Sequence, residues 1–455
     1  MPRQVTLLIV LLLICGFGCT QRHEPVSLQQ IQVEAPFEMP PISYPDFSKT
    51  EKLNIVDFGA DPKDQKATSN AISEAISKAN SLGGGTVIIP PGEWPTGKIH
   101  FKSHVNLHLE KGATLLFSGN PEDYLPAVQS TWEGMECFNY SPLIYAFECE
   151  NIAITGEGEL KAQMDIWEVW FARPDAHMQA LKKLYTMASE GVPVQERQMV
   201  GDEANFRPQF IQFNRSKNIL LEGVTITNSP FWVIHPFLSK DIVIRDVKVF
   251  AHGHNNDGVD PEMSQNILIE DCVFDQGDDA IAVKSGRNQD AWRLNTPTKN
   301  LVIRNSLVKN GHQLLAIGSE LSGGVENVFM ENCTVEEGAK LNHLLFIKTN
   351  ERRGGNVSNI YLKNIKSGRI DLGILGIETD VLYQWRDLVP TYERRLTPIK
   401  NIYLENVKAG NVEFVSRILA DPELPVENIQ LSNVQYDSLR GEKLIHENVV
   451  NFKMD

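Results

Sequence analysis

Residues 254–285 read H-N-N-D-G-V-D-P-E-M-S-Q-N-I-L-I-E-D-C-V-F-D-Q-G-D-D-A-I-A-V-K-S. Within this stretch, Asn266 opens a short run, N-I-L-I-E-D-C, whose isoleucines recur at alternate positions. Such a period of two is typical of a β-strand with one buried face. The same run recurs along much of the chain, so it is the unit from which the fold has to be built.

Variants of this run occur nine times, about 23 to 42 residues apart except for one longer gap. Strand-forming repeats of that length predict a solenoid, in which each coil is closed only by its neighbours. The L-x-x-L-x-L spacing of leucine-rich repeats is absent from the sequence, so we predict an all-β parallel β-helix. The copies begin at Asn151, Asn218, Asp241, Asn266, Asn300, Asn327, Asn359, Asn401 and Asn428.

An asparagine opens nearly every copy of the repeat. Asparagine adopts left-handed backbone conformations more readily than other residues with a side chain, and its amide can form a hydrogen bond to the next coil. We therefore expect a tight corner at this position, repeated from coil to coil.

The first 19 residues form a candidate export signal. Arg3 precedes an apolar run over residues 5–14, and small residues lead to Cys19. The run is too short to span a membrane. The pattern resembles a bacterial lipoprotein signal, in which Cys19 is acylated; an ordinary secretory signal cleaved nearby is the alternative. We expect an exported protein, periplasmic or at the cell surface, whose only membrane contact is this lipid anchor.

The remaining chain divides into a short linker and one large domain. Residues 20–52 are rich in proline and polar residues, and we predict a tether between the membrane and the domain. Residues 53–455 are predicted to form the β-helix. The helical spacing of apolar residues over 67–81, before three glycines at 83–85, predicts a short helix that caps its N-terminal end.

Charge and cysteine content exclude several classes of function. The formal net charge of -15 argues against nucleic acid as a partner, because phosphate binding needs a basic surface. Of six cysteines, two lie in the signal; the others have no zinc-ligand spacing, and we expect buried free thiols rather than disulfides. These four are Cys137, Cys149, Cys272 and Cys333.

Carboxylates gather in the opening stretch. Asp257 and Asp278 are about one coil apart in sequence, and Asp279 follows directly. His312 and Lys348 each follow about one coil further on. Coils stack about 4.8 Å apart, so these side chains are expected to form one strip. Neighbouring carboxylic acids, one protonated and one ionised, are what hydrolysis of a glycosidic bond requires.

These residues resemble the motifs of the polygalacturonases, family 28 of the glycoside hydrolases. That family carries N-T-D, G/Q-D-D, G-H-G and R-I-K motifs on a right-handed parallel β-helix. The corresponding segments here are Asn256-Asp257, Gly277-Asp278-Asp279, Gly311-His312-Gln313 and Phe346-Ile347-Lys348. The resemblance extends from about Leu53 and includes N-S-P-F-W-V-I-H-P at 228–236, which contains His235.

The resemblance implies an inverting hydrolase of α-galacturonosidic linkages that uses no metal or other cofactor. Asp278 is then the general acid, and Asp257 with Asp279 holds the attacking water. His312 tunes the acid and fixes the sugar. Residues expected to bind the substrate are Asn256, His235, Lys284, Arg287, Lys348, Arg352 and Arg353.

Two positions depart from the family motifs. Gln313 replaces the second glycine of G-H-G, and Phe346 replaces the arginine of R-I-K, so one cation expected to face a uronate carboxylate is missing. We expect Arg352 and Arg353 to supply it, and Lys284 and Arg287, in a segment that resembles exo-acting members, to add positive charge.

Two insertions interrupt the repeat, at 165–206 and at 380–396. The first contains Trp167, Trp170 and a predicted helix near 178–189; the second contains Tyr383, Trp385 and Arg386. Insertions in solenoids usually rise on the binding face. We therefore expect a pocket that releases single galacturonate residues from an end of pectic oligosaccharides.

Other functions remain open from the sequence alone. A rhamnogalacturonan-directed hydrolase of the same family would carry the same carboxylates. A polysaccharide lyase shares the β-helix and the acidic substrate, whereas a non-catalytic glycan-binding protein would not need all three aspartates. The oligomeric state cannot be read from the residues.

Overall fold

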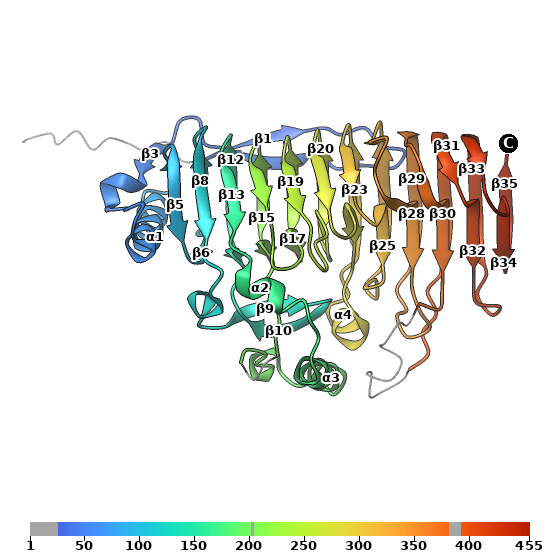
Figure 1. Ribbon diagram of the computed structural model, residues 1–455, viewed down its shortest axis with the longest axis horizontal. Coiled ribbons are helices and arrows are strands. Elements are labelled where there is room, and N and C mark those ends of the chain that lie inside the picture. Colours follow the sequence, from blue (N-terminus) through green and yellow to red (C-terminus); the bar gives the residue numbers. More distant parts are fainter. Residues whose placement is uncertain (1–25, 202–203, 382–392) are drawn as a thin grey trace, which may run out of the picture.

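The computed structural model describes residues 26–201, 204–381 and 393–455, which form a parallel β-helix. Its coils lie side by side along one axis, from helix α1 at one end to strand β35 (Val449–Met454) at the other (Figure 1). Each of the nine predicted copies forms a strand of the largest sheet, parallel to its neighbours. They are β12 (Glu150–Gly156), β15 (Lys217–Glu222), β18 (Lys240–Arg245), β20 (Gln265–Glu270), β23 (Thr298–Arg304), β26 (Val325–Glu331), β29 (Val357–Lys366), β31 (Ile399–Val412) and β33 (Val426–Leu439).

The core consists of columns of apolar side chains that run along the axis. Ile219, Ile242 and Ile267 are paired in register on successive strands, and all three are fully buried. Because the side chains alternate between the two faces, the apolar residue two positions further along each copy joins a parallel column. The predicted inward face is confirmed, and its burial is the main favourable term for the fold.

The asparagine corner is also confirmed. The residues that open the nine copies have φ angles between 55° and 62°, in the left-handed region. Their side chains form a ladder: Asn300 Nδ2 donates to Asn266 Oδ1 over 3.1 Å, and Asn327 Nδ2 donates to Asn300 Oδ1 over 3.0 Å. Asn300 therefore connects its own coil to both neighbours.

The N-terminal end of the solenoid is capped by α1 (Gln65–Ser81), as predicted. Asp64 caps the helix by accepting hydrogen bonds from the backbone N–H groups of Lys66 and Ala67. Ile72 and Ile76 on its inner face are buried in the main core. The helix thus covers the apolar surface that the first coil would otherwise expose.

The prediction of a tether over 20–52 is wrong for residues 26–52. Strands β1 (Ser27–Ile31) and β2 (Ile42–Asp46) form an antiparallel hairpin that lies lengthwise across several coils (Figure 1). Strand β3 (Glu51–Asn54) pairs with β4 (Gly85–Ile89) in the largest sheet. Residues 1–25, including the signal and Cys19, lie outside the described part of the chain.

The hairpin packs on the outer face of the repeat. The third residue of several copies points outward yet is apolar; Val243, Leu268 and Val302 are fully buried beneath the hairpin. Ile42 and Phe47 belong to the same cluster. Apolar side chains exposed to water on many successive coils would cost free energy. The hairpin of β1 and β2 therefore folds onto the domain instead of extending away from it.

A second sheet positions the aspartates. Its strands run from β6 (Ile99–His100) to β34 (Leu444–Glu447), and an isolated bridge at Val259 joins its two parts. The part near the aspartates contains β17 (Ile234–Phe237), β22 (Ile281–Val283), β25 (Gln313–Gly318), β28 (Leu341–Lys348) and β30 (Ile370–Glu378).

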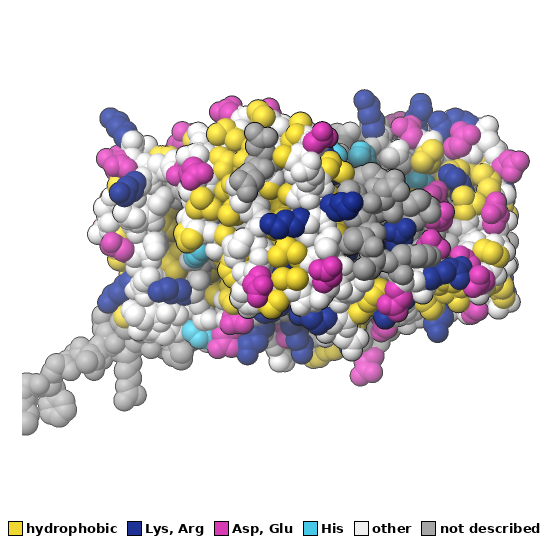
Figure 2. Space-filling model, turned by 90° about the horizontal axis from the view of Figure 1, so that it is seen from below, with side chains coloured by type: hydrophobic (Ala, Val, Ile, Leu, Met, Phe, Trp, Pro, Cys, Tyr) yellow, Lys and Arg dark blue, Asp and Glu magenta, His cyan; other side chains and the backbone are white. Residues whose placement is uncertain are grey.

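Additional elements cover one side of this sheet (Figure 1). The hairpin and the longest helix among them share a small apolar cluster around Trp132 and Phe231, separate from the main core. Seen from this side, lysine and arginine side chains lie among acidic ones (Figure 2). The elements are the hairpin of β9 (Val128–Trp132) and β10 (Met135–Asn139), helices α2 (Asp165–Val169), α3 (Asp175–Ser189) and α4 (Asn288–Leu294), and a 3-10 turn, η3 (Val194–Glu196). Helix α3 confirms the helix expected near 178–189.

The four cysteines among the described residues are all free and buried, which confirms the expectation of thiols in the core.

None of the helices in the described part of the chain combines the length and the apolar character that a membrane crossing requires.

Candidate active site

The predicted acid strip is assembled on the second sheet. Asp278 and Asp279 lie just before β22, His312 directly precedes β25, and Lys348 is the last residue of β28. The register of β22 and β25 places Asp278 beside His312, whereas Lys348 is paired with Gly318 at the other end of β25 and reaches Asp279 through its long side chain. Asp257 lies in the preceding coil, where its carboxylate Oδ1 accepts a hydrogen bond from the backbone N–H of Asp279 over 3.1 Å.

The side chains open into a cavity of about 470 Å³. Its lining mixes carboxylates with cations and a few apolar side chains. It therefore offers both charge signs to a polar ligand. The lining residues are Glu133, Arg173, Trp232, His254, Asn255, Asp257, Asp278, Asp279, Lys284, Arg287, His312, Gln313, Ser319, Glu320, Asn342, His343, Phe346, Lys348, Leu372 and Glu378.

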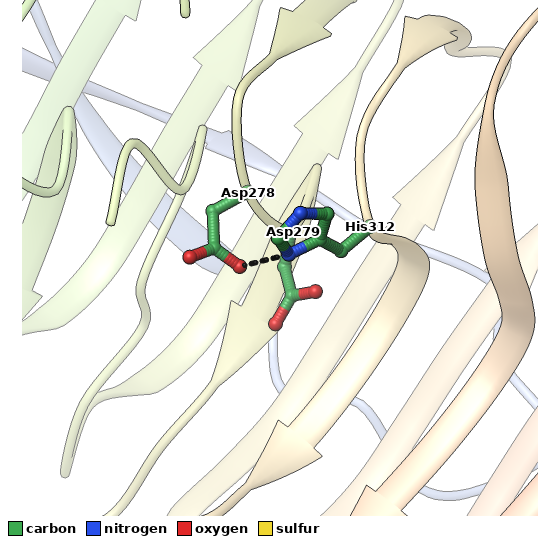
Figure 3. A group of neighbouring side chains, drawn as sticks. All are labelled: Asp278, Asp279 and His312. Carbon is green, nitrogen blue, oxygen red and sulfur yellow. Dashed lines mark hydrogen bonds and ion pairs between the residues drawn. The ribbon is translucent and has the colours of Figure 1, made fainter. Parts of the chain in front are cut away.

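Asp278 is paired with a histidine. Its Oδ1 lies 3.0 Å from Nδ1 of His312, and the two side chains face each other from adjacent coils (Figure 3). This hydrogen bond raises the pKa of His312 above its usual value, against the opposing effect of partial burial. The pair can therefore hold a proton at near-neutral pH.

Asp257 and Asp279 are each paired with a lysine. Lys284 Nζ lies 3.4 Å from Asp257 Oδ2, and Lys348 Nζ lies 3.2 Å from Asp279 Oδ2. Burial raises the pKa of both carboxyls; repulsion from Asp278 adds to the rise at Asp257, while each lysine opposes it. The lysines thus favour the ionised form of two carboxyls that burial alone would keep neutral.

The ligand atoms of Asp278, Asp279 and His312 all lie within 4.8 Å of one another (Figure 3). Asp279 is buried, whereas Asp278 and His312 are partly accessible from the cavity. A single water molecule or substrate oxygen in the cavity is within reach of these groups together, which is the geometry that proton transfer requires.

A wall of ion pairs lines the cavity near the C-terminal ends of β22 and β25. Glu320 contacts Arg287, and its Oε2 lies 3.4 Å from Lys284 Nζ. Arg287 also contacts Glu133, in the turn of the β9–β10 hairpin, at 3.4 Å. Burial alone would raise the pKa of Glu320, but Arg287, Lys284 and Arg353 hold it well below its usual range. Glu320 is therefore an ionised member of the wall.

The turn of the hairpin is docked tightly. The backbone N–H of Arg287 donates to the carbonyl of Gly134 over 3.0 Å. A Cβ atom at Gly134 would lie 3.0 Å from that nitrogen and 3.1 Å from Glu320 Cγ, and its φ of 85° is in the left-handed region. Only glycine fits this turn without displacement, so the wall has a fixed position.

Four of the predicted substrate-binding residues do not reach the cavity, and these predictions are wrong. Asn256 is turned inward and donates to the carbonyls of Ser229 and Phe231. His235 is fully buried, with Nε2 2.9 Å from Glu262 Oε2. Arg353 is buried and donates to the carbonyl of Ser319, and Arg352 is also buried.

The remaining predicted residues do line the cavity, but each cation has a carboxylate partner. Lys284 and Arg287 are almost completely buried, so they belong to the protein's own ion pairs as much as to a ligand site. Phe346, which takes the place of the family's arginine, stacks on His343 with ring centroids 4.5 Å apart. Burial lowers the pKa of His343 to about 3, so this histidine supplies no positive charge in place of the missing arginine.

Sequence reasoning missed several lining residues. Glu320 follows β25 much as Lys284 follows β22, so the phase of the repeat could have indicated it. Glu133 and Arg173 come from segments outside the repeat, and no periodic pattern in the sequence predicts the path of these segments. Arg173 Nη2 lies 2.9 Å from Nε2 of His254, and burial together with Arg173 lowers the pKa of His254 to about 4.

The first insertion lies beside the site, as expected, but not through its tryptophans. Trp167 is fully buried in the main core and packs edge-on against Tyr124 and Trp170. Arg173 is the residue of this insertion that lines the cavity. In the second insertion, Tyr383, Trp385 and Arg386 lie outside the described residues.

The chain is similar to several known proteins. It is 32% identical over 332 residues to a probable polygalacturonase of Vitis vinifera, covering 70% of this chain and 61% of that protein. It is 26% identical over 312 residues to an exo-poly-alpha-D-galacturonosidase of Dickeya chrysanthemi, covering 63% and 50%. The chain thus spans less than two thirds of the length of these relatives.

The structure resembles the crystal structure of a hyperthermoactive exopolygalacturonase from Thermotoga maritima. The TM-score is 0.83 at 35% sequence identity, covering 91% of this chain and 92% of that one. Residues 147–453 match the family described as glycosyl hydrolases family 28. Because this match includes more than half of the chain and every aspartate of the site, the chain belongs to glycoside hydrolase family 28.

Proposed function

We propose that the protein is an inverting glycoside hydrolase that cleaves α-galacturonosidic linkages of pectic chains and releases galacturonate from a chain end. The observation that carries this proposal is one cavity in which three carboxyl groups meet a histidine and a lysine. Relatives named polygalacturonase and exo-poly-alpha-D-galacturonosidase support the same substrate class. A rhamnogalacturonan backbone also presents linked galacturonate and stays a second substrate to test.

The cation beside each carboxyl suggests how the roles are divided. Asp257 and Asp279 each contact a lysine, which favours the ionised form needed to hold and activate water. Asp278 contacts His312, a group that titrates near neutral pH, and is the general acid. In an inverting reaction, one carboxyl protonates the leaving oxygen while water attacks the opposite face of the sugar.

The wall of the cavity favours action at a chain end. The turn of the β9–β10 hairpin is fixed against Arg287 and Glu320, and Arg173 extends the lining from the first insertion. A polymer bound across an open groove would need to continue past this wall. The similarity to the structure of an exopolygalacturonase supports action at a chain end.

Product analysis tests both parts of the proposal. Homogalacturonan of defined length should yield monomer from the first time points, while the viscosity of long polymer falls slowly. NMR of fresh product should show the β-anomer first, because water attacks opposite the leaving group. An early mixture of oligomers would contradict chain-end action, and an initial α-anomer would contradict inversion. An unsaturated product that absorbs in the ultraviolet would indicate a lyase instead.

The location of the protein is part of the proposal. We infer export and lipid attachment at Cys19 from the apolar run and the small residues before it. Metabolic labelling with palmitate should label the wild type and not Cys19→Ser; absence of label from the wild type would contradict an anchor at this residue.

A further inference from the structure

Asp260 is a carboxyl group next to the site that the proposed mechanism does not use. It lies three residues after Asp257 and is fully buried, and it does not line the cavity. Its backbone is held by a hydrogen bond from its N–H to the carbonyl of Ile234 over 2.8 Å. Neighbouring Val259 bridges to both Ile234 and Ile281, so the position of Asp260 is fixed by the sheet.

The bonding of this carboxyl is unusual. Neither oxygen of Asp260 accepts a hydrogen bond from an N–H or O–H donor among the described residues. The nearest ammonium, Lys284 Nζ, is 3.6 Å from Oδ1. Lys284 Nζ also contacts Asp257 Oδ2 at 3.4 Å, so the two carboxyls lie beside the same ammonium group. One of them can donate a hydrogen bond to the other only if it holds a proton.

The residues around Asp257 and Asp260 determine which of the two carboxyls holds the proton. Asp257 accepts a hydrogen bond from the backbone N–H of Asp279, contacts Lys284 at 3.4 Å and lines the cavity. Asp260 has only the longer contact to Lys284, and Glu262 adds further negative charge nearby. Burial, followed by the charge of Asp257, raises the pKa of Asp260 well above its usual value.

We propose that Asp260 is a positioning residue that stays protonated and donates a hydrogen bond to Asp257, holding this carboxylate ionised and turned toward the cavity. This inference rests on the proposed role of Asp257 as one of the two carboxylates that hold the attacking water. Burial and repulsion from Asp278 would otherwise favour protonation of Asp257. The donor hydrogen bond from Asp260 and the charge of Lys284 together offset that tendency.

Kinetics of two variants test the role of the donor. Asp260→Asn keeps an N–H donor without a charge, so kcat should stay within about fivefold of the wild type and the acid limb of kcat/KM should not move. Asp260→Ala removes the donor, so kcat should fall by about tenfold to 100-fold and the acid limb should move to higher pH. A downward shift of the acid limb by about one unit in Asp260→Asn would show that Asp260 is ionised, and would overturn the proposal. Equal losses in both variants would overturn it as well.

The pH dependence of stability gives a test that needs no substrate. A carboxyl with a raised pKa in the folded state takes up a proton on folding, so its stabilising effect is lost as pH rises from the unfolded value toward the folded one. Asp260→Asn needs no proton, so its melting temperature should rise relative to the wild type between about pH 4 and pH 7. A melting temperature that is lowered at neutral pH, with a deficit that shrinks as pH falls below about 4, would identify Asp260 as an ionised partner of Lys284 and overturn the proposal. Should Asp260→Asn fail to fold, Asp260→Ser carries the same comparison, because its hydroxyl also donates.

Glu262→Gln is the matched control. Glu262 is also fully buried, but it accepts hydrogen bonds from the backbone N–H of Gly286 at 3.0 Å and contacts His235 at 2.9 Å. Its replacement should lower stability without the rising trend expected for Asp260→Asn. Infrared spectra at neutral pH should show a protonated carboxylic acid band in the wild type and in Glu262→Gln that Asp260→Asn lacks. Absence of that band from the wild type would overturn the proposal, even if the enzyme hydrolyses no galacturonide.

Discussion

The three aspartates of the site differ most in the cation that each one contacts. Asp278 contacts His312, and the hydrogen bond between them raises the pKa of the imidazole. Asp257 and Asp279 contact lysines, whose charges oppose the rise in pKa that burial causes in both carboxyls. The proposed division of roles rests on these different neighbours.

Replacing Asp278 by asparagine removes the proton donor and preserves the shape of the side chain. We expect kcat to fall by about 10²- to 10⁴-fold, because that is the usual contribution of a positioned acid. Circular dichroism and thermal melts should show a folded protein. Near-normal turnover in the folded variant would exclude Asp278 from the role of general acid.

The same variant should change the titration of His312. The hydrogen bond from Asp278 raises the pKa of His312, so NMR of selectively labelled histidine should show a value above 6.5 that falls in Asp278→Asn. A raised folded-state pKa contributes stability below the unfolded value and loses it as pH rises through the folded one. The variant should therefore be less stable than the wild type at about pH 6, and the difference should shrink at about pH 9. His343, whose pKa burial lowers to about 3, serves as the internal control that does not titrate in this range.

At the residue scale, the sequence was informative where residues are one coil apart. The phase of the repeat correctly brought Asp257, Asp278, His312 and Lys348 into one cavity. It failed for Asn256 and His235, because adjacency to a motif does not fix the direction of a side chain. Successive residues of a strand point to opposite faces, and a covered outer face is as buried as the core.

Among the elements of the fold, those within the repeat were predictable and those outside it were not. Helix α1 and the nine repeat strands follow from periodic apolar residues. The β9–β10 hairpin carries no such period, and its position depends on ion pairs with distant residues, including that of Arg287 with Glu133. Such contacts form only in the tertiary structure, so no local sequence pattern predicts them.

The turn of this hairpin can be tested through Gly134. In Gly134→Ala the new Cβ meets Arg287 and Glu320, so we expect a loss of about 1–3 kcal/mol in unfolding free energy and a higher KM for short galacturonides. Gly201→Ala is the control, because its φ of 81° is similar but no atom lies within 4 Å of its Cβ position. Denaturant melts and initial rates measure both effects. Equal losses in the two variants would mean that backbone strain alone, and not docking of the wall, is responsible.

On the scale of the whole molecule, the N-terminal hairpin of β1 and β2 excludes water from part of the outer face of the solenoid. The outward residue of the repeat is apolar and buried in β18, β20 and β23, but in the last copy it is Gln430, which is exposed. Residues 20–52 contain many proline and polar residues and few apolar ones, and this composition indicated a tether. The apolar residues at outward positions of the repeat are the signal that indicates a covering segment.

A charge introduced at two equivalent positions of the repeat, one beneath the hairpin and one exposed, should show that the hairpin covers the coils. Leu268→Glu buries a carboxylate beneath the hairpin, and we expect a loss of about 3 to 5 kcal/mol in unfolding free energy. Gln430→Glu puts the same charge at the same place in the repeat, in water, and should change stability by less than about 0.5 kcal/mol. Chemical denaturation measures both. A small effect at Leu268 would mean that the hairpin separates readily from the coils.

The lengthwise path of the β1–β2 hairpin also has a mechanical consequence. A solenoid pulled from one end would ordinarily peel, because each coil is held mainly by its neighbours. Here a pull on the hairpin's N-terminal end is transmitted through Ile42 and Phe47 to strands from several coils at once. The load is then carried in shear across these coils, in parallel, and rupture requires many contacts to fail together. In single-molecule force spectroscopy, the first rupture should occur at a markedly higher force for an N-terminal attachment at residue 26 than for one at residue 52.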